Sequence, residues 1–348
     1  EGKSRGRDLC PESYTPATFN RSIASDTTVY GCWLRQFASR PVRLRGLDPG
    51  SEAGLISAMR MPTNGRNERH YDETGPKKEY PMLERYAEKF PAFEYDSPSE
   101  RVLRITFNKP ETYNSLDSAG HRQLTYIWRD IDEDPDISCV ILAAKGKAFS
   151  SGGDFSMIQG NIENWNDTVG AWKEARDLVY NIINCSKPII SAVNGVAVGA
   201  GLVAALLSDI SIIAKSARVL DGHVRLGVAA GDVACINWVI LAGMAKAKYH
   251  LLTNEPVFGE EAERMGLFSL CTEDDALTAR SEEIAATLVA GAPSAIRWTK
   301  LALNNWYRMA MPTFENSLAL EMLGFKGPEA KEGLAAHLEK RQPNWGKN

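Results

Sequence analysis

The chain has 348 residues, of which 44% are apolar and 24% charged, and its formal net charge is −4. That length allows one large domain or two smaller ones with a substantial core, and the slight acidic balance predicts no nucleic-acid partner. Since no apolar run approaches the roughly 20 residues of a membrane-spanning helix, we also expect no membrane segment.

Six cysteines are scattered along the chain, and no two of them have the spacing of a metal site. Cys139, Cys185 and Cys235 lie in or beside apolar segments, which predicts buried free thiols and no metal. The sequence starts at Glu1 without the apolar stretch of a secretory signal, so we expect a cytoplasmic protein. A start without Met leaves the true N-terminus open.

Residues 1–80 differ in composition from the rest, being rich in Arg, Ser, Pro and Gly with little apolar periodicity. We interpret them as a partly irregular N-terminal extension. A poorly ordered leader is favoured over an arm that packs on a neighbouring subunit, because chain ends usually lack order unless they are tied down.

From residue 81 the pattern becomes globular, and strands alternate with helices up to residue 273. In chain order we predict a helix over Met82–Phe90, a strand over Arg101–Asn108, a helix over Ser118–Asp130 capped by Ser118, a strand over Ser138–Ala143, a loop over Gly146–Asp154, a helix over Val169–Ile183, a strand over Pro188–Val193, a helix from Gly199 to Leu207, a strand over Ile210–Ala214, and helices over Asp232–Leu241 and Gly259–Met265. This alternation predicts an α/β core over residues 81–273.

Residues 274–348 are predicted to be all-helical, which is typical of an assembly or lid region. The predicted helices cover Asp275–Leu288, Ser294–Met311, Thr313–Leu323 and Glu329–Lys340.

Two glycine-rich segments each follow a predicted strand and precede a helix. The first holds Ser151, Gly152, Gly153 and Asp154, and the second runs from Asn194 to Gly201. Free N–H groups at a helix start favour negative charge, so one N–H from each segment could stabilise an oxyanion or enolate. Either segment alone is more often a tight strand–helix turn.

These segments, FSSGGDF and KPIISAVNGVAVGAG, together with the trailing EGLAAHLEKRQPNW, resemble the crotonase (enoyl-CoA hydratase/isomerase) superfamily from about residue 98 to the C-terminus. The resemblance implies a crotonase-like α/β fold of repeated ββα turns with a helical C-terminal trimerisation region. It implies a homotrimer or a dimer of trimers, a place in fatty acid metabolism, and an acyl-CoA substrate. No separate cofactor is implied, because coenzyme A enters as part of the substrate.

By motif position, the resemblance implies that the N–H groups of Gly153 and Ala200 form the oxyanion hole, with Ser151, Gly152, Asp154 and Gly199 beside the substrate. Of these, Asp154 is more often a structural residue of its loop. The family's lysine that reaches a CoA phosphate would fall on Lys340. Alternatively, Lys340 is a solvated lysine at a helix end without a role in binding.

Two departures from the family pattern concern the reaction. The two glutamates of typical hydratases would fall on positions that hold Val203 and His223 here. His223, with Asp232 nine residues later, is therefore the candidate acid/base group. Asp232 could equally cap the following helix.

Three functions follow from this pattern. The leading hypothesis is a hydratase or isomerase that acts on an acyl-CoA. The spacing of His223 and Asp232 resembles that of crotonase-family β-diketone hydrolases of the 6-oxocamphor hydrolase type, whose second-loop histidine is missing here. The third hypothesis is a scaffold that has lost catalysis. The apolar side chains over residues 155–172 predict a bulky apolar substrate.

Overall fold

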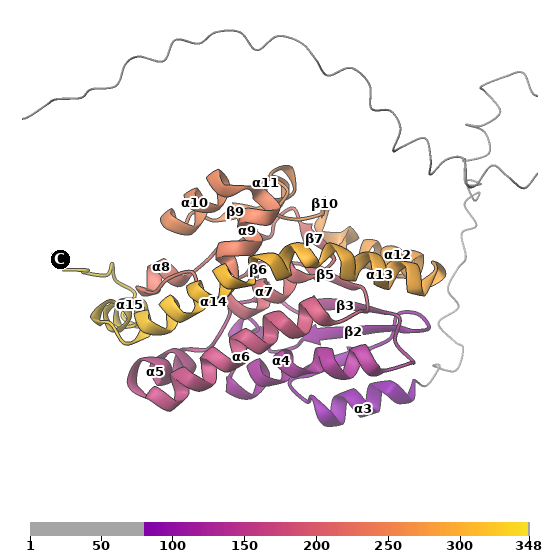
Figure 1. The fold of residues 1–348 in the computed structure, drawn as a ribbon, viewed down its shortest axis with the longest axis horizontal. Coiled ribbons are helices and arrows are strands. Elements are labelled where there is room, and N and C mark those ends of the chain that lie inside the picture. The colour runs from indigo at the N-terminus through magenta and orange to yellow at the C-terminus, as the bar shows by residue number, and fades with distance from the viewer. Residues whose placement is uncertain (1–79, 347–348) are drawn as a thin grey trace, which may run out of the picture. The chain divides into compact units, whose positions relative to one another are not determined.

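The computed structural model describes residues 80–346 of the chain. The N-terminal extension predicted for residues 1–80 therefore lies almost entirely outside the described residues. Within that range the backbone forms two sheets and a set of covering helices (Figure 1). No helix in residues 80–346 has the length and apolar character needed to cross a membrane.

The larger sheet has the order β1-β2-β3-β5-β7-β10 and is parallel apart from β1, which pairs antiparallel with β2. Its strands are β1 (Phe93–Asp96), β2 (Val102–Phe107), β3 (Cys139–Ala144), β5 (Ile189–Val193), β7 (Ile210–Ala214) and β10 (Leu270–Thr272). The apolar runs of β3 and β5 are buried on both faces, as is typical of a covered parallel sheet.

The smaller sheet has the order β4-β6-β8-β9 and consists of short strands. They are β4 (Ala148–Ser150), β6 (Val196–Ala197), β8 (Arg218–Val219) and β9 (Val257–Phe258). In three successive units a strand of the large sheet is followed by a strand of the small sheet and then by helix. This arrangement confirms the predicted α/β fold of repeated ββα turns.

The helices in the N-terminal part of the described chain are α3 (Pro81–Lys89), α4 (Ser118–Glu133), α5 (Phe155–Glu163), α6 (Trp165–Asn184) and α7 (Gly199–Leu207), with a 3-10 turn at Pro110–Thr112. They are followed by α8 (His223–Leu226), α9 (Ala234–Ala242), α10 (Met244–Thr253) and α11 (Gly259–Arg264). The predicted helix ends agree within a few residues for α3, α4, α6, α7, α9 and α11. The cap of α4 is Asp117 and not Ser118, because Asp117 Oδ1 accepts the Gly120 N–H at 2.7 Å.

The C-terminal region is helical, as predicted, and comprises α12 (Leu277–Ala290), α13 (Pro293–Leu303), α14 (Asn305–Phe325) and α15 (Pro328–Leu338) after a 3-10 turn at Asp274–Ala276. Helix α14 lies beside α6 and α9 (Figure 1). Its packing places Phe314 and Leu318 in the core, where both are fully buried.

The predicted helix break at Pro312 is wrong. Pro312 lies inside α14, and the break falls at Asn304, whose Nδ2 donates to the Ile183 carbonyl at 2.9 Å. That bond fixes the α13–α14 junction on the end of α6. The packing of α14 on α6 and α9 then holds the helix through Pro312, although proline lacks the N–H of a helical bond.

The predicted buried thiols are confirmed for Cys139 and Cys185, which are both free and buried. Cys235 is only half-buried, and its Sγ lies 3.0 Å from the Ala230 carbonyl oxygen.

Candidate active site

One pocket brings together most of the residues expected at the site. Ser151, Gly152 and Gly153 line it from the loop after β4, Gly199 and Ala200 from the start of α7, and His223 and Asp232 from α8 and the loop after it. Glu321 and Phe325 of α14 close another side, so the C-terminal helices complete the pocket. The chain thus places the two glycine-rich segments and the His223 region in a single cavity.

The loop after β4 leaves one N–H group free for a ligand. The Gly152 N–H donates to Ser150 Oγ at 3.2 Å, and the Asp154 N–H donates to the Leu116 carbonyl at 3.0 Å. The Gly153 N–H between them has no acceptor among the described residues. Gly152 has φ +85°, a left-handed conformation that favours glycine. The unpaired Gly153 N–H therefore belongs to a residue that lines the pocket.

The start of α7 offers the second donor. Ala200 is the second residue of the helix, so its N–H has no partner within the helix. A Cβ on Gly199 would lie 3.0 Å from the Gly152 Cα, and Gly199 itself has φ +55°. The positive φ of both residues and the close approach at Gly199 favour glycine where the two loops meet. The Gly153 and Ala200 N–H groups consequently belong to adjoining backbone segments of the same pocket wall.

His223 lies among three carboxylates. Its Nδ1 lies 3.0 Å and 3.1 Å from the two carboxylate oxygens of Asp221, and its backbone N–H donates to Asp221 Oδ1 at 3.1 Å. Its Nε2 lies 3.5 Å from Glu321 Oε1 and 3.7 Å from Asp232 Oδ2. Because Asp221 accepts the Nδ1–H, the opposite ring nitrogen faces Asp232 and Glu321.

Burial and charge shift the pKa of both central groups of this cluster. Burial alone would lower the pKa of His223, but the charges of Asp221, Asp232 and Glu321 outweigh it and raise the pKa well above its ordinary value. Burial raises the pKa of Asp232 to about 7, against the attraction of His223 and with the help of Asp221 and Glu321. At neutral pH His223 is therefore an imidazolium, and Asp232 can both give and take a proton.

The loop between α8 and α9 is tightly constrained around Asp232. A Cβ on Gly231 would come within 2.4 Å of Glu321 Cβ and 2.5 Å of the Ser317 carbonyl oxygen, so only glycine lets α14 approach. Val233 is buried with φ +112°, a conformation that β-branched residues rarely adopt. Helix α9 begins at Ala234 with Val233 in the cap position, and the Ala234 N–H donates to the Asp232 carboxylate from one residue further out.

Asp221, His223 and Asp232 also have the composition of a small metal site. One ligand atom from each lies within 4.8 Å of the others. In this arrangement Asp221 already holds both the Nδ1 and the backbone N–H of His223, and the imidazolium supplies the positive charge that three carboxylates need. We therefore treat the cluster as an acid/base site.

Two expected site residues lie apart from the pocket lining. Asp154 is the cap of α5, where its Oδ1 accepts the Met157 N–H at 3.0 Å, in line with a structural role. Lys340 is exposed beyond the end of α15 with φ +53° and does not line the pocket.

The apolar stretch over residues 155–172 divides between two faces. Met157 and Ile158 line the pocket, as predicted for substrate contacts. Trp165 and Trp172 do not: they lie with Leu323 in a separate apolar groove between α6 and α14, and Trp165 is 68% exposed. The prediction of a bulky apolar substrate therefore loses the two tryptophans on which it partly depended.

Two pocket residues were missed in the sequence. Glu321 lies on the buried face of α14 between Leu318 and Phe325. A glutamate on the apolar face of a helix is unusual, and this position could have indicated a functional residue from the sequence. His121 of α4 also lines the pocket. Its position in an otherwise ordinary amphipathic helix gave no signal.

Residues 98–348 match the family described as enoyl-CoA hydratase/isomerase. A short-chain-enoyl-CoA hydratase of Clostridium acetobutylicum is 31% identical over 254 residues, which cover 71% of this chain and 95% of that protein. A 1,2-epoxyphenylacetyl-CoA isomerase of Escherichia coli is 29% identical over 252 residues, which cover 70% of this chain and 94% of that protein. The crystal structure of an enoyl-CoA hydratase/isomerase from Mycobacterium paratuberculosis superimposes with a TM-score of 0.67 at 26% identity, covering 70% of this chain and 97% of that one.

Proposed function

Because the chain belongs to the enoyl-CoA hydratase/isomerase family, we propose that it hydrates or isomerises an acyl-CoA thioester through an enolate. The observation that carries this proposal is the meeting, in one pocket, of two free backbone N–H groups with a buried acid/base cluster. The two relatives named above are a hydratase and an isomerase, so family membership leaves both reactions open.

The two N–H groups would hold the thioester oxygen. When a base removes a proton from the α-carbon, or water adds to the β-carbon, an electron pair moves toward the thioester carbonyl and the oxygen becomes negative. Donation from Gly153 and Ala200 stabilises that charge more than the neutral carbonyl of the substrate, which is the condition for catalysis.

Asp232 would move the proton. Its pKa of about 7 lets the carboxylate accept a proton from water or from the α-carbon and the acid return it in the next step. The His223 imidazolium, held by Asp221, keeps Asp232 and Glu321 oriented and balances their charge. Asp232 and Glu321 would thus take the place of the glutamates that Val203 and His223 replace.

Binding of acyl-CoA tests this proposal directly. We expect isothermal titration to detect binding of saturated acyl-CoA thioesters with a dissociation constant in the micromolar to millimolar range. Lys340→Ala should weaken this binding, because it removes the positive charge that would meet a CoA phosphate. Lys331→Ala on α15 is the matched control and should bind as the wild type does. The absence of binding by any acyl-CoA at millimolar concentration would contradict the proposal.

A β-diketone hydrolase is the second candidate, and the approach of His223 Nε2 to Asp232 at 3.7 Å favours it. The ultraviolet absorbance of cyclic β-diketones, measured during incubation with the protein, distinguishes a β-diketone hydrolase from an acyl-CoA enzyme. Loss of absorbance without any binding of CoA thioesters would support hydrolysis. A lapsed scaffold would show neither activity.

The raised pKa of Asp232 has a measurable effect on stability. Between about pH 4 and pH 7 the folded protein holds a proton on Asp232 that the unfolded chain releases, so the free energy of unfolding falls as the pH rises through this window. The raised pKa of His223 acts in the same direction at higher pH, since its contribution is lost as the pH rises through the folded pKa.

We expect Asp232→Asn to be more stable than the wild type at pH 8 by more than about 1 kcal/mol, with a much smaller difference at pH 4. Urea unfolding of both proteins at the two pH values measures this. In Glu321→Gln the free energy of unfolding should fall less steeply with pH than in the wild type, because the Glu321 charge helps to raise the pKa of Asp232. An equal difference between wild type and Asp232→Asn at both pH values would mean that Asp232 titrates normally.

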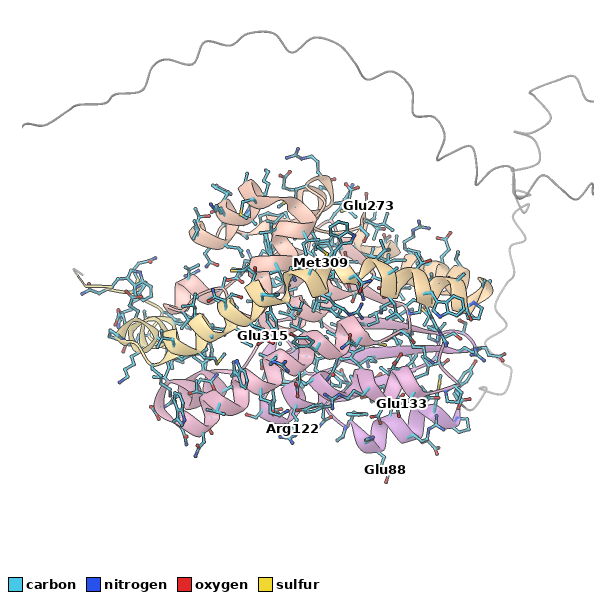
Figure 2. The ribbon with its side chains drawn as sticks, in the orientation of Figure 1. Glu88, Arg122, Glu133, Glu273, Met309 and Glu315 are labelled. Carbon is cyan, nitrogen blue, oxygen red and sulfur yellow. The ribbon has the colours of Figure 1, made fainter. Side chains whose placement is uncertain are left out.

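Assembly as a homotrimer or a dimer of trimers is part of the same proposal. Trp298, Leu303, Trp306 and Met309 of α13 and α14 are each more than 60% exposed, and Figure 2 labels Met309 on α14. Large apolar side chains gathered on neighbouring helices are typical of a subunit interface. Light scattering on the full chain gives the particle mass that tests it.

A further inference from the structure

A second histidine–carboxylate pair lies at the same pocket: buried His121 lines it, and its partner Glu174 is half-buried. His121 of α4 is 8% exposed, and its Nδ1 lies 3.2 Å from Oε2 of Glu174 on α6. No hydrogen bond or ion pair within residues 80–346 joins this pair to the cluster around His223. The proposed reaction therefore leaves it without a role, although a polar pair in a largely apolar wall is costly unless it is used.

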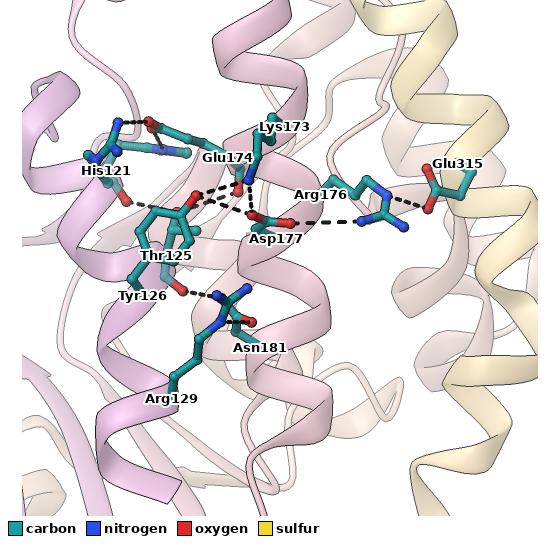
Figure 3. Close-up of polar contacts among 11 residues, drawn as sticks. His121, Thr125, Tyr126, Arg129, Lys173, Glu174, Arg176, Asp177, Asn181 and Glu315 are labelled. Atoms are coloured by element: carbon teal, nitrogen blue, oxygen red, sulfur yellow. Dashed lines mark hydrogen bonds and ion pairs between the residues drawn. The ribbon is translucent and has the colours of Figure 1, made fainter. Parts of the chain in front are cut away.

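Two further contacts from α4 surround the pair (Figure 3). Thr125 Oγ1 donates to the His121 carbonyl at 2.9 Å, and the Arg122 guanidinium donates to Glu174 Oε1 at 3.4 Å. On α6, Glu174 is the chain neighbour of Ala175, which lines the pocket, whereas Glu174 itself lies outside the lining. The pair is thus a fixed polar point on an apolar surface.

The second ring nitrogen of His121, Nε2, is open to solvent. Nε2 has no hydrogen-bond partner within residues 80–346. The atom is also not fully buried. Solvent therefore reaches it, and since His121 lines the pocket, we take the pocket as the route. A ligand in the pocket would meet Nε2 directly.

The start of α4 connects this pair to the proposed oxyanion hole. The His121 N–H donates to the Asp117 carbonyl, and the neighbouring Leu116 N–H donates to the Gly152 carbonyl at 2.9 Å. His121 thus stands one helical turn from the loop that presents the Gly153 N–H. An acyl chain whose thioester oxygen rests on that loop would have His121 on one of its walls.

We propose that His121 and Glu174 form a subsite that hydrogen-bonds a hydroxyl group on the acyl chain of the substrate. With Nδ1–H donated to Glu174, the neutral ring accepts from a hydroxyl through Nε2, and the charged ring donates to the same group. A hydroxyl pairs with either state, whereas a carbonyl oxygen pairs only with the charged ring. This inference rests on the proposed function and narrows its substrate class to hydroxylated acyl-CoA thioesters.

Titration with matched ligands tests the subsite without any turnover. The ligands are hexanoyl-CoA and its counterparts with a hydroxyl at C4, C5 or C6. For the wild type we expect at least one hydroxylated ligand to bind more tightly than hexanoyl-CoA. His121→Phe keeps the ring volume and should cost that ligand about 10–100-fold in affinity while leaving hexanoyl-CoA unchanged.

Three further variants separate a binding role from a structural one. Glu174→Gln should lose part of the preference for the hydroxylated ligand over hexanoyl-CoA. The double variant of Glu174→Gln and His121→Phe should lose no more of this preference than His121→Phe alone, because the two residues act together. His121→Gln, which retains a polar tip, should restore part of the preference. His337→Phe, an exposed histidine outside the pocket lining, should bind both ligands as the wild type does.

Equal affinity of the wild type for all four ligands, or equal losses for all four in His121→Phe, would overturn the subsite and leave the acyl-CoA proposal intact. If no thioester binds the wild type, both proposals fail. Thermal unfolding of each variant shows whether a loss comes from misfolding.

Discussion

Asp232→Asn is expected to lower kcat by about 10²–10⁴-fold for turnover of an α,β-unsaturated acyl-CoA, the usual contribution of general acid–base catalysis. The substitution keeps the shape of the side chain but removes the group whose pKa lies near neutrality. Because Asn still fills the site, KM should change much less than kcat. Loss of the ultraviolet absorbance of the conjugated thioester measures both constants for a hydration.

Asp136→Asn is the matched control, since that carboxylate is exposed and lies outside the pocket lining. His223→Gln should be about as damaging as Asp232→Asn, because it removes the charge that keeps the carboxylates oriented. The double variant should be little worse than either single one, as is usual for groups that act as a unit. A kcat within twofold of wild type in Asp232→Asn would rule out Asp232 as the proton carrier.

Ala200→Pro is expected to lower kcat by about 10²–10³-fold, which is the typical cost of one lost oxyanion donor. Proline has no N–H, and the first turn of a helix tolerates it because no helical bond is lost there. The side chain of Ala200 contributes little, so the change isolates the backbone donor. Single-turnover kinetics with saturating substrate measures the chemical step.

Ala200→Gly keeps the N–H and should retain kcat within a fewfold, which makes it the control for local packing. Thermal unfolding must show that Ala200→Pro remains folded. If the folded Ala200→Pro protein turned over at the wild-type rate, the thioester oxygen would have to lie elsewhere, and the two-amide oxyanion hole would be wrong.

Local signals in the sequence were sufficient for much of the fold. The strand predicted over Ile210–Ala214 has the same bounds in the structure, because a short run of apolar β-branched residues between turns favours a buried strand. The helix break was misplaced because the competition between Pro312 and Asn304 is decided by packing on α6. Local patterns contain no information about that contact.

The candidate site was predictable only where chain order brings its parts together. Gly153, Ala200 and His223 follow the second strand of three successive ββα units and Asp232 follows α8, and the pocket unites them. Glu321 and His121 could not be assigned, because their approach depends on how α14 and α4 dock from distant parts of the chain. The charge state of His223 likewise depends on carboxylates up to 98 positions away.

The position of Glu321 on α14 has a consequence for synthesis of the protein. A ribosome makes the chain from the N-terminus, so both glycine-rich segments and the Asp221–Asp232 segment emerge more than 70 residues before α14 does. During that interval the nascent core has no α14 to pack against Gly231 or to bring Glu321 to His223. The cluster around His223 is therefore completed only as synthesis finishes, and a chain released early would hold the two glycine-rich segments without Glu321.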